Sequence, residues 1–215
     1  MKGGYDLVRV FIDISEWCYR LMILNFCWIA GILAGLVIFG ITPSTIAMHT
    51  VTRKWAQKEL DFSVPKTFFQ AYKENFIGKN IIGFSFLGIG IFLLINLRIS
   101  FIVPGTLMMI TFYFNLFLLL LLIMSVIMFF NIYTKYHYET KWQYMKQSIA
   151  FTIASPGTIV LHLIGFVVMG TLLYRLPGLI PFCSGSLIAY WSSIVTNNRF
   201  KKLEKRVLGE NNSTV

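Results

Sequence analysis

Residues 104–132, PGTLMMITFYFNLFLLLLLIMSVIMFFNI, contain no charged side chain. A helix that crosses a bilayer needs about 20 predominantly apolar residues, so this stretch is long enough to span a membrane. It lies within one of five intervals without Asp, Glu, Lys or Arg, which are residues 21–52, 80–97, 99–134, 147–174 and 176–198. The sequence therefore predicts an all-α fold with five transmembrane helices.

The composition agrees with a membrane protein. Of 215 residues, 56% are apolar and only 13% are charged, against roughly 25% charged residues in a soluble domain, and the mean hydropathy is +0.69. Five spans take about half of the chain, which leaves too few residues for a separate soluble catalytic domain. This excludes extracellular enzymes, DNA-binding domains and Rossmann-type folds, and it predicts a single integral membrane domain over residues 1–215.

The first charged segment has helical periodicity. Asp6, Arg9, Asp13 and Glu16 share one face of residues 5–17, with apolar residues between them, which predicts an N-terminal amphipathic helix at the membrane interface. A straight continuation to residue 40 would be roughly 50 Å long, beyond a core of about 30 Å. We therefore expect a bend near residues 17–20. We expect the five spans at residues 21–41, 81–97, 104–132, 157–174 and 179–196, and the short link at 98–103 predicts that the second and third form an antiparallel hairpin.

The connections also carry structural signals. At the end of the first span, Thr42 is suited to cap a new helix and Pro43 to occupy its first position. Residues 44–60, 66–80 and 133–147 mix aromatic and basic side chains, which predicts helical loops at the headgroup level. The layout of residues 21–97 resembles that of residues 104–174, which is consistent with a weak parallel repeat followed by the fifth helix at 179–196. The shared basic aromatic character of cytoplasmic loops explains the likeness equally well.

Basic residues give an orientation. The connections at 42–80 and 132–155 and the C-terminal tail hold 14 of the 19 Lys and Arg residues. By the positive-inside rule these segments are cytoplasmic, and five spans then place the N-terminus outside and the C-terminus in the cytoplasm of a multi-pass cell membrane protein. The net charge of +10 indicates contact with anionic lipid and not with nucleic acid.

The chain lacks motifs for catalysis. His49, His137 and His162 do not have metal-ligand spacing, and phosphate-binding or serine-esterase motifs are absent from the sequence. We therefore expect a protein that is not an enzyme, with no catalytic residue, metal or cofactor. We expect His162 to bond a neighbouring helix, and Asn25, Asn96 and Asn115 to cross-link helices in the same way.

Two sets of residues are candidates for packing and binding. Gly31 and Gly35 form a small-xxx-small face, which favours close approach of another helix. A second set combines aromatic side chains with Lys, Arg and Asn, residue types that suit protein interfaces and also interfacial anchors. We interpret it as a cytoplasmic docking surface for a partner, made of Arg53, Lys54, Trp55, Phe68, Phe69, Tyr72, Lys73 and Asn75.

The stretches GITPSTIAMHTVTRKW and KTFFQAYKENF resemble the YesL-like family of bacterial membrane proteins, whose domain has no assigned function. The matching positions are Thr45, Ala47, Thr52 and Lys54, and then Phe68, Phe69, Tyr72, Lys73, Asn75 and Phe76. Members of this family are typically encoded beside carbohydrate ABC importers, so the resemblance implies an accessory role in sugar uptake and no defined activity.

Two functions follow as expectations. In the first, the protein is a non-enzymatic auxiliary subunit that packs against the permease subunits of a carbohydrate ABC importer, and its cytoplasmic aromatic loops contact these subunits or the ATPase. In the second, it is a stand-alone membrane channel or a membrane component coupled to a sensor kinase. The spans lack the buried charges of an ion or proton relay, which disfavours a coupled transporter.

Overall fold

The computed structural model describes the backbone of residues 2–212 and the side chains of residues 9–205. Helices account for nearly all of this part of the chain, and it contains no β-strand. The predicted all-α class is therefore confirmed. The helices are α1 (Lys2–Ala34), α2 (Ile41–Ala56), α3 (Val64–Lys73), α4 (Phe76–Ile102), α5 (Thr106–Lys135), α6 (Lys141–Ala154), α7 (Pro156–Arg175), the short 3₁₀ helix η1 (Pro177–Leu179) and α8 (Ile180–Asn212).

Five of the helical segments in the described part are long and apolar enough to cross a membrane. This agrees with the five spans predicted from the charge-free intervals. The segments are Arg9–Ala34, Phe76–Ile102, Thr106–Lys135, Pro156–Arg175 and Pro177–Lys205. Most of them extend beyond the predicted limits, because a helix continues past the hydrocarbon wherever no residue interrupts its hydrogen bonding.

The chain packs as two units. Unit 1 combines the residues up to Glu74 with the residues from His162 onward, and unit 2 comprises Asn75–Leu161. The boundaries of the units do not coincide with the halves of the predicted repeat, and the repeat stays a prediction.

In unit 1, α1 and α2 form an antiparallel hairpin. The ring of Trp17 meets the ring of Trp55 with centroids 5.7 Å apart, and Trp28 Nε1 donates to Thr45 Oγ1 at 3.3 Å. Helix α8 packs against both arms, because Trp17 also contacts Tyr190 with ring centroids 5.2 Å apart. The C-terminal end of α2 and the N-terminal half of α1 therefore lie at the same end of the hairpin.

The start of the chain differs from the prediction in two ways. Helix α1 runs from Lys2 to Ala34 without interruption, so the bend expected near residues 17–20 is wrong. No proline or glycine occurs at residues 5–30 to break the helix. The side chains of residues 2–8, including Asp6, lie outside the described part, and the interfacial position of this segment stays a prediction.

The corner after α1 also differs from the prediction. It lies at residues 35–40, and α2 begins at Ile41 with Gly40 as its N-cap, so Thr42 does not cap the helix. Pro43 sits within the first turn, where a helix does not need its N–H. Leu36 and Val37 adopt left-handed backbone angles, with φ of 53° and 65°, and thereby reverse the chain.

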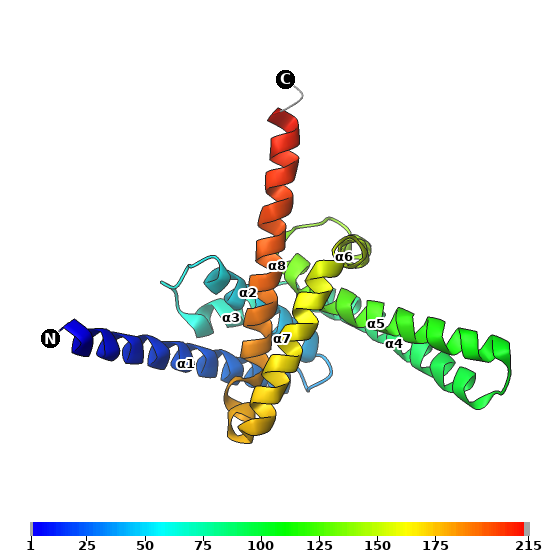
Figure 1. The fold of residues 1–215 in the computed structure, drawn as a ribbon, viewed down its shortest axis with the longest axis horizontal. Helices are drawn as coiled ribbons and strands as arrows, with labels where there is room; N and C mark the ends of the chain where they lie inside the picture. The colour runs from blue at the N-terminus through cyan, green and yellow to red at the C-terminus, as the bar shows by residue number, and fades with distance from the viewer. Residues whose placement is uncertain (1, 213–215) are drawn as a thin grey trace. The chain divides into compact units, whose positions relative to one another are not determined.

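In unit 2, α4 and α5 run side by side as a long hairpin, as Figure 1 shows in green. Phe86 of α4 and Phe129 of α5 pack with ring centroids 5.4 Å apart. Helix α6 packs on the C-terminal part of α5, where Tyr133 stacks on Tyr144 with centroids 4.7 Å apart. The predicted hairpin of the second and third spans is therefore present.

Candidate functional site

The structure divides the predicted docking residues into buried and accessible side chains. Trp55, Phe68 and Tyr72 are core residues of unit 1, with exposed fractions of 2%, 0% and 9%. Burial also raises the pKa of the Tyr72 phenol above its ordinary value. These three side chains pack inside the unit and do not offer a surface to a partner. Their aromatic spacing reflects the buried face of short helices.

The outward face of α3 retains accessible members of the set. Phe69 is 38% exposed, and Lys66, Gln70 and Lys73 beside it are exposed as well. Helix α3 begins after Ser63 with Pro65 in its first turn, and Val64 and Phe68 face the interior. An exposed aromatic side chain between two lysines therefore projects from an amphipathic helix.

The remaining docking candidates lie elsewhere. Arg53 and Lys54 are half-buried at the end of α2, and Lys54 forms an ion pair with Glu59 at 3.7 Å. Asn75 belongs to unit 2, where its Nδ2 donates to Tyr133 Oη at 3.1 Å and its backbone is left-handed, with φ of 44°. Asn tolerates this conformation better than most residues, so Asn75 has a local role at the start of α4.

Gly31 and Gly35 lie where other parts of unit 1 come close to the backbone of α1 and of the corner that follows it. A Cβ atom on Gly31 would lie 2.5 Å from Ser44 Oγ and 3.3 Å from the Phe68 ring. A Cβ atom on Gly35 would overlap the backbone of Gly40. The two glycines allow α1 to approach α2 and the corner of its own hairpin, so these positions are occupied from within the chain.

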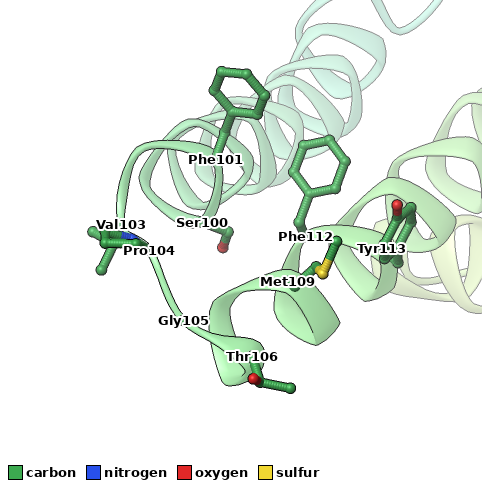
Figure 2. Close-up of a pocket in the computed structure, with 9 residues that line it drawn as sticks. All are labelled: Ser100, Phe101, Val103, Pro104, Gly105, Thr106, Met109, Phe112 and Tyr113. Atoms are coloured by element: carbon green, nitrogen blue, oxygen red, sulfur yellow. The ribbon is translucent and has the colours of Figure 1, made fainter.

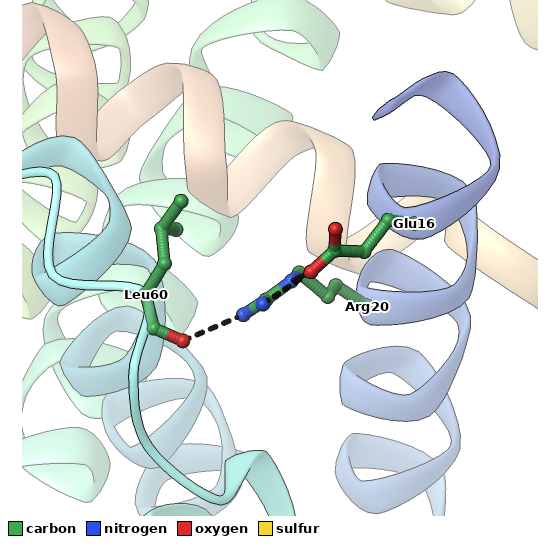
Figure 3. Close-up of polar contacts among 3 residues, drawn as sticks. All are labelled: Glu16, Arg20 and Leu60. Carbon is green, nitrogen blue, oxygen red and sulfur yellow. Dashed lines mark hydrogen bonds and ion pairs between the residues drawn. The ribbon is translucent and has the colours of Figure 1, made fainter. Parts of the chain in front are cut away.

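A polar contact fastens the other end of the hairpin (Figure 3). Arg20 Nη1 donates to the carbonyl oxygen of Leu60 at 2.9 Å, and Arg20 Nε donates to Glu16 Oε1 at 3.0 Å. Arg20 thus joins α1 to the loop at residues 57–63. The sequence indicated the charges at positions 16 and 20, but it gave no signal for the distant carbonyl.

The interior of unit 1 contains a polar seam, which we define as His49 and Thr52 of α2 with Ser192, Ser193 and Thr196 of α8. All five side chains are buried. Thr52 Oγ1 lies 2.8 Å from Ser193 Oγ, and His49 Nδ1 lies 3.5 Å from the same oxygen. Sequence analysis missed the seam, although the four polar residues among positions 192–197 of an apolar span were a usable signal.

Two further side chains link helices of unit 1 as predicted. His162 Nε2 lies 3.1 Å from Ser192 Oγ. Asn25 Nδ2 donates to the carbonyl of Pro181 at 2.8 Å, and Asn25 Oδ1 accepts from the N–H groups of Gly185 and Ser186. Such bonds satisfy polar groups that would be costly in hydrocarbon.

The same prediction is wrong for Asn96 and Asn115. Asn96 Nδ2 donates to the carbonyl of Phe92 at 2.9 Å, and Asn115 Nδ2 donates to the carbonyl of Thr111 at 3.0 Å. Each asparagine therefore bonds its own helix four residues earlier, because the backbone carbonyl at i−4 is always within reach.

A tyrosine cluster closes unit 2 at the junction of α5 and α6. Tyr144 Oη accepts from the Tyr138 N–H at 3.1 Å and donates to the Tyr136 carbonyl at 3.3 Å. Burial raises the pKa of the Tyr138 phenol, and the neighbouring Tyr136 and Tyr144 raise it further. The buried Lys79 ammonium lies 5.8 Å from the Tyr133 ring centroid. The cluster fixes the loop between the two helices.

A cavity of about 500 Å³ lies at the tip of the α4–α5 hairpin, and its lining residues are drawn in Figure 2. The lining carries aromatic and aliphatic side chains with the hydroxyl groups of Ser100, Thr106 and Tyr113, and it includes no charged residue. Its chemistry suits an apolar group and offers no counter-ion for a charged solute.

The described residues contain no group of three or more His, Cys, Asp or Glu side chains that could hold a metal ion. Within residues 9–205, Thr196 Oγ1, Ser44 Oγ and Trp55 Nε1 are buried polar atoms of unit 1 without a hydrogen-bond partner.

Five long apolar helices and a hydrogen-bonded polar interior define an α-helical multi-pass membrane protein. The chain belongs to the YesL-like family, described as "Protein of unknown function, DUF624", which matches residues 21–97. It is similar to three Bacillus subtilis (strain 168) proteins, all described as uncharacterized. YteU is 34% identical over 81% of this chain and 78% of its own length. YesL is 31% identical over 88% of this chain and 89% of its own length. YesV is 32% identical over 84% of this chain and 86% of its own. No solved structure matches the chain.

Proposed function

We propose that this protein is a non-enzymatic auxiliary subunit of a bacterial carbohydrate ABC importer, and that it packs against the permease subunits. The observation that carries the proposal is the outward face of α3, where the exposed Phe69 stands between Lys66 and Lys73. Aromatic side chains are enriched in protein interfaces. Truncation of an aromatic side chain at the centre of an interface can cost about 2 kcal/mol or more of binding free energy. The same face would be cytoplasmic if the basic segments and the C-terminus are cytoplasmic.

The proposal is tested by gentle purification of the protein together with its natural neighbours. Phe69→Ala is expected to reduce recovery of the permease subunits by about tenfold or more, since each 1.4 kcal/mol of lost binding corresponds to a factor of ten. Gln70→Ala, on the same exposed face, serves as the matched control. Unchanged recovery with Phe69→Ala, or a wild-type protein that purifies alone, would refute the proposal.

A second candidate function is a stand-alone channel for a small solute, and the polar seam of unit 1 favours it. A channel needs polar groups along a path through hydrocarbon, and the seam supplies buried hydroxyl groups of α2 and α8 together with the imidazole of His49 in α2. Solute flux into vesicles that contain only the purified protein distinguishes the candidates. Solute flux that is present with the wild-type protein and abolished by Ser193→Ala supports a channel. No flux with the wild-type protein supports the auxiliary subunit.

A further inference from the structure

The hairpin of α1 and α2 ends in an apolar corner. Residues 35–40 read GLVIFG and contain no polar side chain. Leu36 is 80% exposed, and its neighbours on the corner are exposed as well; they are Leu33, Val37, Ile38, Phe39 and Ile41. Contiguous exposed apolar side chains mark a surface that another apolar phase covers.

The backbone of the corner does not need water. Every N–H group from Gly35 to Ile41 donates to a carbonyl of the corner or of the preceding turn, with N···O distances of 2.8–3.1 Å. In hydrocarbon, each backbone N–H group without a hydrogen bond costs on the order of several kcal/mol of free energy. The corner therefore meets the main requirement for a turn inside a bilayer.

The opposite end of the hairpin is charged on both arms. Arg20 and Glu16 lie on α1, and the loop at 57–63, to which Arg20 donates, carries Lys58, Glu59 and Asp61. These three loop residues are exposed. A charge in the hydrocarbon costs at least about 2.5–3.5 kcal/mol. Both arms must therefore leave the hydrocarbon at this end.

The uncharged part of α1 is short for a complete crossing. The span at Arg9–Ala34 reaches its length only by including residues 9–20, which carry Arg9, Asp13, Glu16 and Arg20. Residues 21–34 fall within the range of about 10–14 apolar residues that is typical of re-entrant segments. At about 1.5 Å per residue, this part extends roughly 21 Å, less than a core of about 30 Å.

We propose that α1 and α2 form a re-entrant hairpin, whose corner inserts into the lipid hydrocarbon and whose two charged ends lie on the same side of the membrane. The segment before Arg20 then shares its side with the 57–63 loop, in place of the outside location expected from five complete crossings. Helix α8 agrees with this arrangement, because Asn197 Nδ2 donates to the carbonyl of Ala56 at 3.4 Å, so its basic C-terminal end lies at the charged end of the hairpin.

The test is accessibility of single cysteines to a membrane-impermeant maleimide, in intact cells and in inverted vesicles. The starting protein carries Cys18→Ser, Cys27→Ala and Cys183→Ala, which removes the native thiols. Asp13→Cys and Glu59→Cys report the two arms at the charged end. Ile38→Cys reports the corner. Thr106→Cys, at the exposed start of α5, reports the far end of the α4–α5 hairpin.

We expect the cysteines at positions 13 and 59 to react from the same side, the cysteine at 106 from the other side, and the cysteine at 38 from neither side until detergent is added. Reaction of positions 13 and 59 from opposite sides would overturn the proposal. Reaction of position 38 from the side that labels position 106 would also overturn it, because the hairpin would then cross the whole membrane. Neither result depends on whether the protein binds an importer.

Discussion

Gly31 provides a quantitative test of the packing between α1 and α2. Replacement by alanine adds a Cβ atom 2.5 Å from Ser44 Oγ, whereas ordinary contacts begin at 3.4 Å. Ser44 Oγ is buried and has no hydrogen-bond partner in the described part of the chain. We therefore expect Ser44→Ala to relieve the overlap without a cost of its own.

The magnitudes follow from two opposing effects. Alanine in a helix is favoured over glycine by about 1 kcal/mol, and overpacking of a filled core costs about 1–3 kcal/mol. Gly31→Ala should thus lower the free energy of unfolding by up to about 2 kcal/mol. Gly88→Ala in α4 is the control, because a Cβ there meets nothing within 4 Å; it should retain the favourable effect alone.

In the assay, the protein is solubilised in mild detergent and titrated with a denaturing detergent. Circular dichroism monitors the loss of folded protein. The four proteins of the cycle are the wild type, Gly31→Ala, Ser44→Ala and the double variant. We expect the double variant to be more stable than the sum of the single effects predicts, with a coupling free energy of about 0.5–3 kcal/mol. Strict additivity would refute the argument that this hydroxyl group limits the approach of α1.

Three other predictions concern side chains outside the seam. Phe68→Ala should destabilise the protein by about 3–5 kcal/mol and Phe69→Ala by less than about 1 kcal/mol, in the same unfolding assay; the reverse order would contradict their burial. Tyr144→Phe removes the two hydrogen bonds from Tyr144 Oη to the 136–140 loop and should cost about 1–3 kcal/mol, with faster amide exchange in that loop; unchanged exchange would contradict it. The raised pKa of Tyr138 means that the folded protein keeps this proton when the unfolded chain has lost it, so stability should be constant at pH 7–9 and fall above about pH 10. Tyr138→Phe should weaken this fall in a pH series of unfolding curves, and an identical fall in both proteins would exclude Tyr138 as its source.

The spans were predictable because the absence of charge over 18 or more residues is a property of the local sequence. The α4–α5 hairpin followed directly, since the link between two long apolar runs is short. The corner at residues 35–40 was not predictable in the same way. Thr42 and Pro43 favoured a corner at residues 42–44, but Leu36 and Val37 take the left-handed backbone, which their residue types do not favour.

The sequence predicted which residue types make up the candidate docking surface. It did not predict which of these side chains are buried. The aromatic spacing at positions 68, 69 and 72 is compatible with a docking face or with a core, and only the packing of unit 1 shows that Phe68 and Tyr72 are inside. The polar seam depends on residues about 140 positions apart, such as Thr52 and Ser193. Pairing at that distance along the chain leaves no local pattern.

The discontinuity of unit 1 has a consequence for synthesis of the protein. His49 and Thr52 emerge from the ribosome long before Ser193, and all of unit 2 is made between them. Until α8 arrives, these polar groups of α2 lack the serine that bonds them in the finished fold. A chain that stops before residue 192 therefore lacks the α8 side of the seam, and Thr52 Oγ1 keeps only its bond to the His49 carbonyl within α2. The packing of unit 1 is therefore completed only after the whole of unit 2 has been made.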